Sequence, residues 1–207
     1  MSVKVKICGI TCVADGLAAA EAGADMIGLM FYARSPRYVS VAAAKEISRA
    51  LSPFVIKVGV FVNPDEDTVM RAISECGVTL LQFHGEEKPE FCAQFGVMSM
   101  KAFRVRDADS LLALPDYATD AYLLDAYSPD AHGGTGAKFN WELAIEAKKQ
   151  GKPVFLAGGL TPENVGAAVQ QVQPFGVDVS SGVESAPGKK DAAKVRAFIQ
   201  NAKQVVY

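Results

Sequence analysis

The sequence predicts a single α/β domain over residues 1–207, folded as a (β/α)8 (TIM) barrel in which helices surround eight parallel strands. Two observations carry this prediction. Short apolar runs recur about every 25 residues, and each is followed by a polar turn and a segment with helical spacing. The chain of 207 residues is also near the lower end of the length that eight such units need, and no proline- or glycine-rich linker divides it.

Eight apolar runs are the expected strands of a parallel sheet. They are Val3–Cys8, Met26–Phe31, Val55–Val62, Thr79–Phe83, Met98–Phe103, Ala121–Asp125, Val154–Ala157 and Gly176–Val179. An open, doubly wound sheet is the alternative. The closed barrel is favoured because the chain holds eight units and has no Gly-x-Gly-x-x-Gly after its first strand.

The segments between these strands carry apolar residues at the spacing of one helix face, which predicts helices packed on the barrel. The clearest stripes are Val69, Ala72, Ile73 and Cys76, and later Val195, Phe198, Ile199 and Ala202. The tetrapeptide Thr161–Asn164 (TPEN) places a hydroxyl cap before a proline and an acidic residue. A helix is therefore expected to begin there.

The composition argues against several classes of partner. A net charge of −2 provides no cationic field for nucleic acid or an anionic membrane. The first eight residues mix lysines with apolar residues, as in a strand and not in a signal peptide or a spanning helix. Four cysteines without a Cys-x-x-Cys pair indicate free thiols and a cytoplasmic protein. The two histidines lack metal-ligand spacing, so no metal is expected.

In a (β/α)8 barrel the active site lies at the carboxyl ends of the strands, and phosphate binds to the loops after strands 7 and 8. Here those loops begin with Gly158-Gly159 and with Ser180-Ser181-Gly182. Glycine lets backbone N–H groups approach phosphate oxygens, and serine adds a donor. Paired glycines alone can merely turn the chain, but two such loops in these two places favour phosphate. Gly133–Gly136 (GGTG) lacks P-loop spacing and predicts either a closing loop or a plain turn.

Cys8 and Asp125 end the first and sixth strands, so they are expected to face each other across the barrel mouth. Alone, such a cysteine is often a buried apolar residue and such an aspartate a helix cap. Together they can supply one base and one acid. A basic Cys8 would need a field that favours the thiolate, which the phosphate-binding helix end is expected to provide.

Arg37 follows a proline on the second loop, where its guanidinium can grip a carboxylate through two parallel hydrogen bonds. Arg34 can do the same, and either can instead be a solvated surface residue. His84 at the fourth strand end is interpreted as a ligand contact or a rim residue. The set suggests a substrate with a phosphate at one end and a carboxylate at the other.

Ordered motifs run along nearly the whole chain. They are Lys6–Thr11 (KICGIT), Ser35–Val39 (SPRYV), Val58–Asn63 (VGVFVN), Gln82–Glu86 (QFHGE), Leu124-Asp125, Gly133–Gly136, Ala157–Val165 (AGGLTPENV) and Gly176–Glu184 (GVDVSSGVE). Each motif alone is weak, whereas this number in this order is very specific. In these motifs the chain resembles the phosphoribosylanthranilate isomerase family.

The resemblance implies an Amadori rearrangement of N-(5′-phosphoribosyl)anthranilate in tryptophan biosynthesis, with no cofactor. It implies Asp125 as the general acid, Cys8 as the general base and Arg37 as the carboxylate ligand. Phosphate would be held by backbone at Gly158, Gly159, Ser181 and Gly182, and His84, Asp178 and Ser180 are the remaining expected substrate contacts. The chain is expected to be a monomer or a homodimer with a small phosphorylated substrate as its partner.

Three other interpretations stay open. One is an enzyme that also accepts the related aminoimidazole ribonucleotide of histidine biosynthesis. The enzyme of that pathway normally works with two aspartates, so Cys8 on the first strand favours the tryptophan-pathway substrate. An indoleglycerol-phosphate synthase-like lyase would need lysines at strand ends, whereas Lys57 and Lys101 lie within strands and outside matching motifs. A catalytically silent phosphate-binding barrel would not need Cys8 and Asp125.

Overall fold

The computed structural model describes residues 2–126 and 141–205. Eight parallel strands close into a barrel in chain order, and the last strand pairs with the first. They are β1 (Lys4–Cys8), β2 (Met26–Met30), β3 (Ile56–Phe61), β4 (Leu80–Phe83), β5 (Met98–Val105), β6 (Ala121–Ala126), β7 (Val154–Ala157) and β8 (Gly176–Val179). The predicted barrel is confirmed, and each predicted strand end lies within two residues of the observed one.

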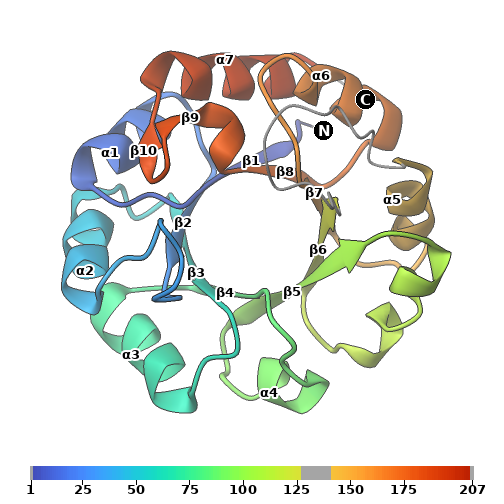
Figure 1. Cartoon of the computed structure of the whole chain (residues 1–207), viewed down its shortest axis with the longest axis horizontal. Coiled ribbons are helices and arrows are strands. Elements are labelled where there is room, and N and C mark those ends of the chain that lie inside the picture. The colour runs from blue at the N-terminus through green and yellow to red at the C-terminus, as the bar shows by residue number, and fades with distance from the viewer. Residues whose placement is uncertain (1, 127–140, 206–207) are drawn as a thin grey trace.

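Helices form a ring outside the strands (Figure 1). They are α1 (Val13–Glu21), α2 (Val41–Ala50), α3 (Glu66–Cys76), α4 (Pro89–Ala93), α5 (Trp141–Lys148), α6 (Val165–Val172) and α7 (Ala192–Lys203). Two 3-10 helices, η1 (Ala108–Leu111) and η2 (Leu114–Asp116), follow β5 in place of a longer helix. After β8 come the 3-10 helix η3 (Ser181–Val183) and a small hairpin of β9 (Glu184–Ala186) and β10 (Lys189–Lys190).

Apolar side chains cover both faces of the strands, as a parallel sheet buried on both sides requires. One cluster fills the barrel interior and includes Met26, Val58, Val60, Leu80, Met100, Leu123 and Phe155. A larger cluster lies between the strands and the helices. In the predicted helix stripes, the last one is buried throughout, and Ile73 is the one partly exposed member of the first.

The expected start of the sixth helix is wrong by a few residues. Thr161–Asn164 forms a turn, and α6 begins at Val165. The Thr161 carbonyl accepts hydrogen bonds from the backbone N–H groups of Asn164 and Val165, and Asn164 Oδ1 accepts from the Thr161 N–H. The Asn164 side chain thus closes a turn ahead of α6, whereas the bond from the Val165 N–H to the Thr161 carbonyl already has the spacing of an α-helix.

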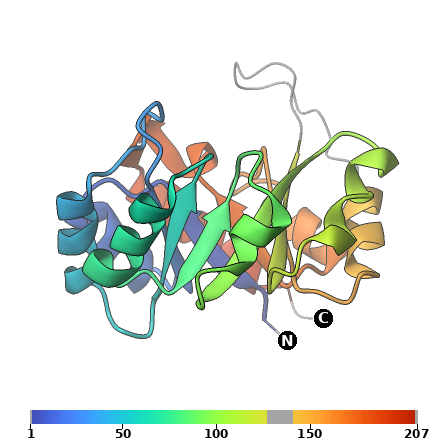
Figure 2. The same ribbon diagram turned by 90° about the horizontal axis from the view of Figure 1, so that it is seen from below.

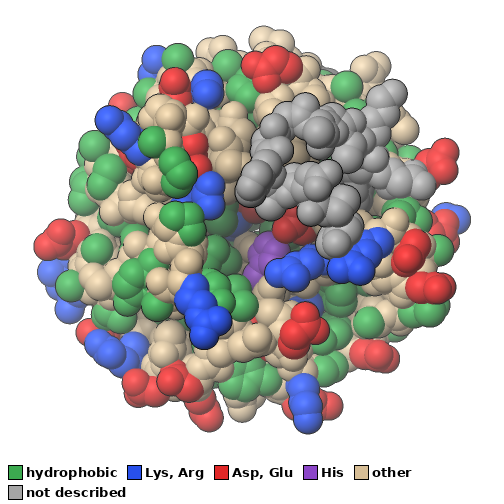
Figure 3. Space-filling model, in the orientation of Figure 1, with side chains coloured by type: hydrophobic (Ala, Val, Ile, Leu, Met, Phe, Trp, Pro, Cys, Tyr) green, Lys and Arg blue, Asp and Glu red, His purple; other side chains and the backbone are tan. Residues whose placement is uncertain are grey.

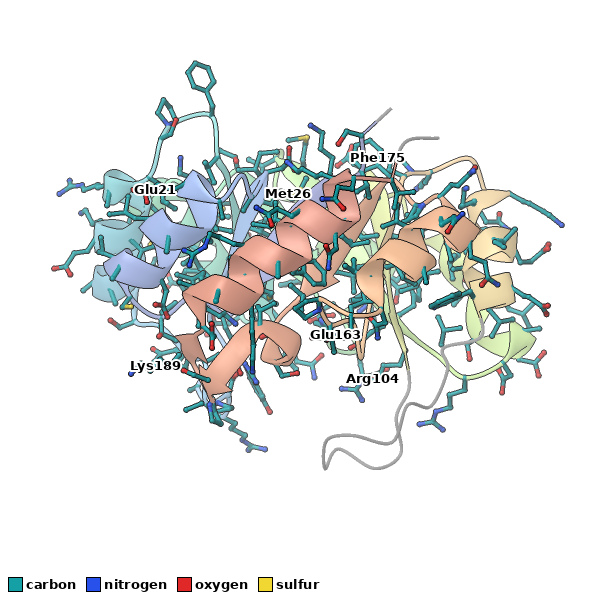
Figure 4. The ribbon with its side chains drawn as sticks, turned by 90° about the horizontal axis from the view of Figure 1, so that it is seen from above. Glu21, Met26, Arg104, Glu163, Phe175 and Lys189 are labelled. Carbon is teal, nitrogen blue, oxygen red and sulfur yellow. The ribbon has the colours of Figure 1, made fainter. Side chains whose placement is uncertain are left out.

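The strands run from one end of the molecule to the other inside the helices (Figure 2). Met26 and Phe175, which begin or precede strands, lie at one end, whereas Arg104, Glu163 and Lys189 lie at the opposite end (Figure 4). The second end carries the strand-to-helix loops and therefore the expected active site. Within the described ranges, no helix has the length and apolarity to cross a membrane.

Candidate active site

The ten candidate residues line one cavity at the carboxyl ends of the strands, with a volume of about 360 Å³. They are Cys8, Arg37, His84, Asp125, Gly158, Gly159, Asp178, Ser180, Ser181 and Gly182. The same face of the molecule is hollowed at its centre, with histidine, acidic and basic side chains around the hollow (Figure 3). Residues up to 174 positions apart in sequence thus share one site, because parallel strands bring their carboxyl ends together.

Cys8 is the last residue of β1, and Asp125 lies near the end of β6. The strands β7 and β8 separate them in barrel order, so the two side chains enter the cavity from opposing walls. Cys8 is 6% exposed, and this burial raises the pKa of its thiol above the ordinary value. Lys6 and Lys190 act in the opposite direction. Two lysines therefore contribute positive charge at Cys8. The expected contribution of the phosphate-binding helix end stays a prediction.

A short chain of hydrogen bonds reaches Asp125 from β4. Gln82 Nε2 lies 3.0 Å from His84 Nδ1, and His84 Nε2 lies 3.1 Å from Asp125 Oδ2. With the Gln82 amide oriented so that its Nε2 faces the ring, Nδ1 of His84 accepts and Nε2 of the ring carries an N–H. Nε2 then donates to Oδ2, which leaves Oδ1 as the Asp125 oxygen able to carry a transferable proton.

Arg37 is held in place by an acidic partner. Its Nε and Nη2 donate to the two carboxylate oxygens of Glu184 at 2.8 and 2.7 Å. Lys190 Nζ donates to the same carboxylate at 2.8 Å. Burial raises the pKa of Glu184, but hydrogen bonds from Arg37 and Lys190 outweigh it and hold the pKa below the ordinary value. The Nε edge of Arg37 is thus occupied, and its Nη1 side remains for a ligand.

The loops after β7 and β8 present backbone donors to the cavity. Gly158 and Gly159 have φ values of 80° and 65°, the left-handed region that glycine adopts without strain. Gly159, Ser181 and Gly182 line the same cavity, so their backbone N–H groups are candidate donors to a bound anion.

The family comparison decides between the candidate chemistries. The model of the N-(5′-phosphoribosyl)anthranilate isomerase family matches residues 5–201. The chain belongs to that family. An N-(5′-phosphoribosyl)anthranilate isomerase from Citrifermentans bemidjiense is 56% identical over 202 residues, which is 98% of each chain.

Solved structures of phosphoribosylanthranilate isomerases agree with this assignment. The crystal structure from Thermotoga maritima superposes with a TM-score of 0.91 at 41% identity, covering 98% of this chain and 100% of its own. A second structure holds reduced 1-(o-carboxyphenylamino)-1-deoxyribulose 5-phosphate, with a TM-score of 0.87, 39% identity and the same coverage. The expected isomerase of tryptophan biosynthesis is therefore confirmed.

The lyase interpretation loses support in this isomerase family member. Lys57 and Lys101 alternate with the interior residues Val58 and Met100, so they point away from the barrel interior. Lys57 Nζ donates to the Ser52 carbonyl, and Lys101 Nζ pairs with Glu87 at 2.7 Å. Neither lysine can serve a lyase reaction in the cavity. Among the described residues, no group of three or more His, Cys, Asp or Glu is arranged to hold a metal ion.

Four residues of the site were not singled out from the sequence. Gln82 and Glu184 lie inside motifs of the family, but their contacts to His84 and Arg37 depend on the folded loops. Lys190 comes from the distant hairpin and carries no local signal. Lys6 did carry a local signal, because it lies two residues before Cys8 and so must share the same face of the strand. The predicted Gly133–Gly136 loop lies outside the described residues.

Proposed function

We propose that this enzyme rearranges N-(5′-phosphoribosyl)anthranilate to 1-(2-carboxyphenylamino)-1-deoxyribulose 5-phosphate by general acid–base catalysis, with Asp125 as the acid and Cys8 as the base. The observation that supports it most is the placement of a thiol and a carboxyl group on opposing walls of one cavity. An anion-binding loop pair and an arginine flank them. A substrate with an anion at each end would lie between the two groups.

The two anions of the substrate match two different parts of the cavity. The phosphate would accept hydrogen bonds from the backbone of Gly158, Gly159, Ser181 and Gly182, with Ser180 beside them. The anthranilate carboxylate would bind the Nη1 side of Arg37, whose other edge Glu184 already holds. Fixing both ends places the reacting carbons between Cys8 and Asp125, which is the positioning that makes proton transfer efficient.

The proton steps balance without a cofactor. Asp125 donates a proton to the furanose ring oxygen as the C1′–O bond breaks, and the nitrogen lone pair forms the Schiff base. The Cys8 thiolate then takes the C2′ proton. The electrons of the broken C2′–H bond form the C1′=C2′ bond of the enolamine, and the electrons of the C=N bond move to nitrogen, which becomes neutral. The enolamine loses its hydroxyl proton and gains one at C1′ to give the ketone. A proton returned from Cys8 to Asp125 through solvent resets the enzyme.

His84 and Gln82 support the acid in this scheme. His84 Nε2 contacts Asp125 Oδ2, which orients the carboxyl group at the cavity that both residues line and leaves Oδ1 as the other acidic oxygen. Asp178 lines the cavity as well and pairs with Lys6. We propose that His84 and Asp178 contact the substrate through the cavity they line.

The test is the loss of anthranilate fluorescence when the protein meets freshly generated phosphoribosylanthranilate. Cys8→Ser and Asp125→Asn should each lose about 10²- to 10⁴-fold in kcat, the usual contribution of one acid or base. Both should still bind the reduced product analogue, because they remove proton transfer and not binding contacts. The matched control is Cys12→Ser, an exposed thiol outside the cavity, which should keep full activity.

Equal and mild losses in both site variants would refute the assignment of acid and base. Conversion of the histidine-pathway ribonucleotide by the wild-type enzyme would add that second substrate. The cytoplasmic location and the choice between monomer and homodimer stay predictions, and light scattering of the purified chain decides the latter.

A further inference from the structure

A buried ion pair lies directly beneath the proposed base. Lys6 and Asp178 face each other on the neighbouring strands β1 and β8. Lys6 Nζ donates to Asp178 Oδ1 at 2.9 Å, and the lysine side chain is 0% exposed. Lys6 and Cys8 alternate with the outward-facing Ile7, so both point into the barrel.

Stability alone does not account for this pair. Taking two charges out of water costs several kcal/mol, and well-packed apolar residues in their place are often neutral or stabilising. The rest of the barrel interior uses that solution, since Met26, Val58, Leu80, Met100 and Leu123 fill it. A buried lysine among these apolar residues of the barrel interior therefore indicates a role beyond packing.

The lysine and the thiol meet over a position without a side chain. A Cβ placed on Gly28 of β2 would lie 2.8 Å from Cys8 Sγ and 3.2 Å from Lys6 Nζ. Both atoms thus occupy the space above one glycine, next to each other. Any larger residue at position 28 would push the ammonium and the sulfur out of this arrangement, because the Cys8 backbone is only 3.0 Å away.

The charges around Cys8 act on its thiol in opposite directions. Burial raises the pKa of Cys8 above its ordinary value, Lys6 is the strongest influence that lowers it, and the carboxylate of Asp178 raises it further. Burial lowers the pKa of Lys6, but Asp178 and Cys8 outweigh it, so the pKa is raised and the ammonium stays charged. The charged groups facing Cys8 are Lys6, Asp178, Lys190 on β10 and Arg37 on the loop after β2.

We propose that Lys6 is a positioning residue for the base: its ammonium, anchored by Asp178, orients the Cys8 sulfur and supplies the positive charge that a thiolate needs inside the barrel. The inference rests on the proposed role of Cys8 as the base. Lys6 transfers no proton in this scheme. It remains an ammonium while the thiolate takes the C2′ proton and becomes a thiol.

The test measures the titration of Cys8 in the free enzyme by the ultraviolet absorbance of its thiolate. Cys12→Ser serves as the background, and the same protein with Cys8→Ser is subtracted, which leaves the signal of Cys8. Lys6→Met with Asp178→Asn removes both charges and leaves no unpaired ion. This double variant should move the midpoint of the Cys8 titration up by about one pH unit, a tenfold loss of thiolate at a given pH.

Asp178→Asn alone is the second variant, because it keeps the lysine and removes the anion. Its midpoint should move down, opposite to that of the double variant. Opposite shifts distinguish a charge effect from a packing effect, which would move both titrations in the same direction. The acid limb of the kcat/KM profile of the double variant should move with its thiolate titration.

Two results would overturn the inference. They are an unchanged Cys8 midpoint in the folded double variant, and shifts of the same sign in both variants. If the double variant does not fold by circular dichroism, a failure of Asp178→Asn to lower the midpoint also overturns it. The proposed function fails separately, through a Cys8→Ser variant that retains kcat, whatever the Lys6 titrations show.

Discussion

Glu184 holds two cations at the rim of the active site, and Glu184→Gln tests how much that arrangement contributes. The Glu184 and Lys190 side chains are only 5% and 2% exposed, whereas Arg37 is 22% exposed. Removing one partner of a buried ion pair costs about 3–5 kcal/mol because it leaves an uncompensated charge. We expect the lower end, about 3 kcal/mol of the free energy of unfolding, since the amide can still accept one hydrogen bond and Arg37 is partly solvated.

Urea denaturation followed by circular dichroism measures this loss, and thermal unfolding should show it as a Tm about 6–12 °C lower. The matched control is Glu75→Gln on α3, which breaks an ion pair with Arg71 whose side chains are 51% and 39% exposed. That variant should lose little or no stability, because solvent screens an exposed ion pair. In the same Glu184→Gln protein, KM for phosphoribosylanthranilate should rise more than kcat falls, because Arg37 is left less well oriented. A loss equal to that of Glu75→Gln, with KM unchanged, would refute the reasoning.

Three further predictions follow from other contacts of the site. Lowering the pH should shrink the stability difference between the wild type and Glu184→Gln. The folded state depresses the pKa of Glu184, so the contribution of Glu184 to stability is complete above the unfolded pKa of about 4.3 and is lost as the pH falls through the folded pKa. Denaturation at neutral and acid pH measures this, and a constant difference would contradict it. Gln82→Glu should lower kcat by about 10²-fold, because a carboxylate accepts a proton from His84 Nδ1, favours imidazolium and keeps Asp125 ionised; steady-state rates equal to those of the wild type would exclude this chain of hydrogen bonds. Gly182→Ala should raise KM about tenfold, because a Cβ there meets the Leu160 carbonyl oxygen and displaces the N–H donors. Gly166→Ala should leave KM unchanged, because a Cβ there would lie an ordinary 3.5 Å from the Asn201 carbonyl oxygen.

The sequence predicted the barrel well because the relevant signals are local. A strand buried on both faces reads as a continuous apolar run, which is why Val154–Ala157 and Gly176–Val179 have the predicted bounds. Helix starts depend on finer competition, and the polar residues of Thr161–Asn164 hydrogen-bond within a turn instead of opening α6. Such competition between a cap and a turn cannot be read from residue types alone.

The chemistry of the site divides in the same way. The positions of Cys8 and Asp125 at strand ends, and of glycines and serines after strands 7 and 8, follow from chain order once a barrel is assumed. What each group does depends on neighbours that are distant in sequence. Arg37 was expected to bind a ligand carboxylate through two parallel hydrogen bonds of its guanidinium group. In the structure its Nε and Nη2 already donate to Glu184, 147 positions away in sequence.

By itself, then, the sequence determined the fold class, the family and ten of the residues at the cavity, because the hydrophobic periodicity and the ordered motifs are properties of the chain. The tertiary structure decided the electrostatics of that cavity. Lys6 meets Asp178 across 172 positions, and Lys190 reaches the same cavity wall from a hairpin. Charges act through space and their strength depends on burial, so only the folded molecule shows which of them govern the thiol.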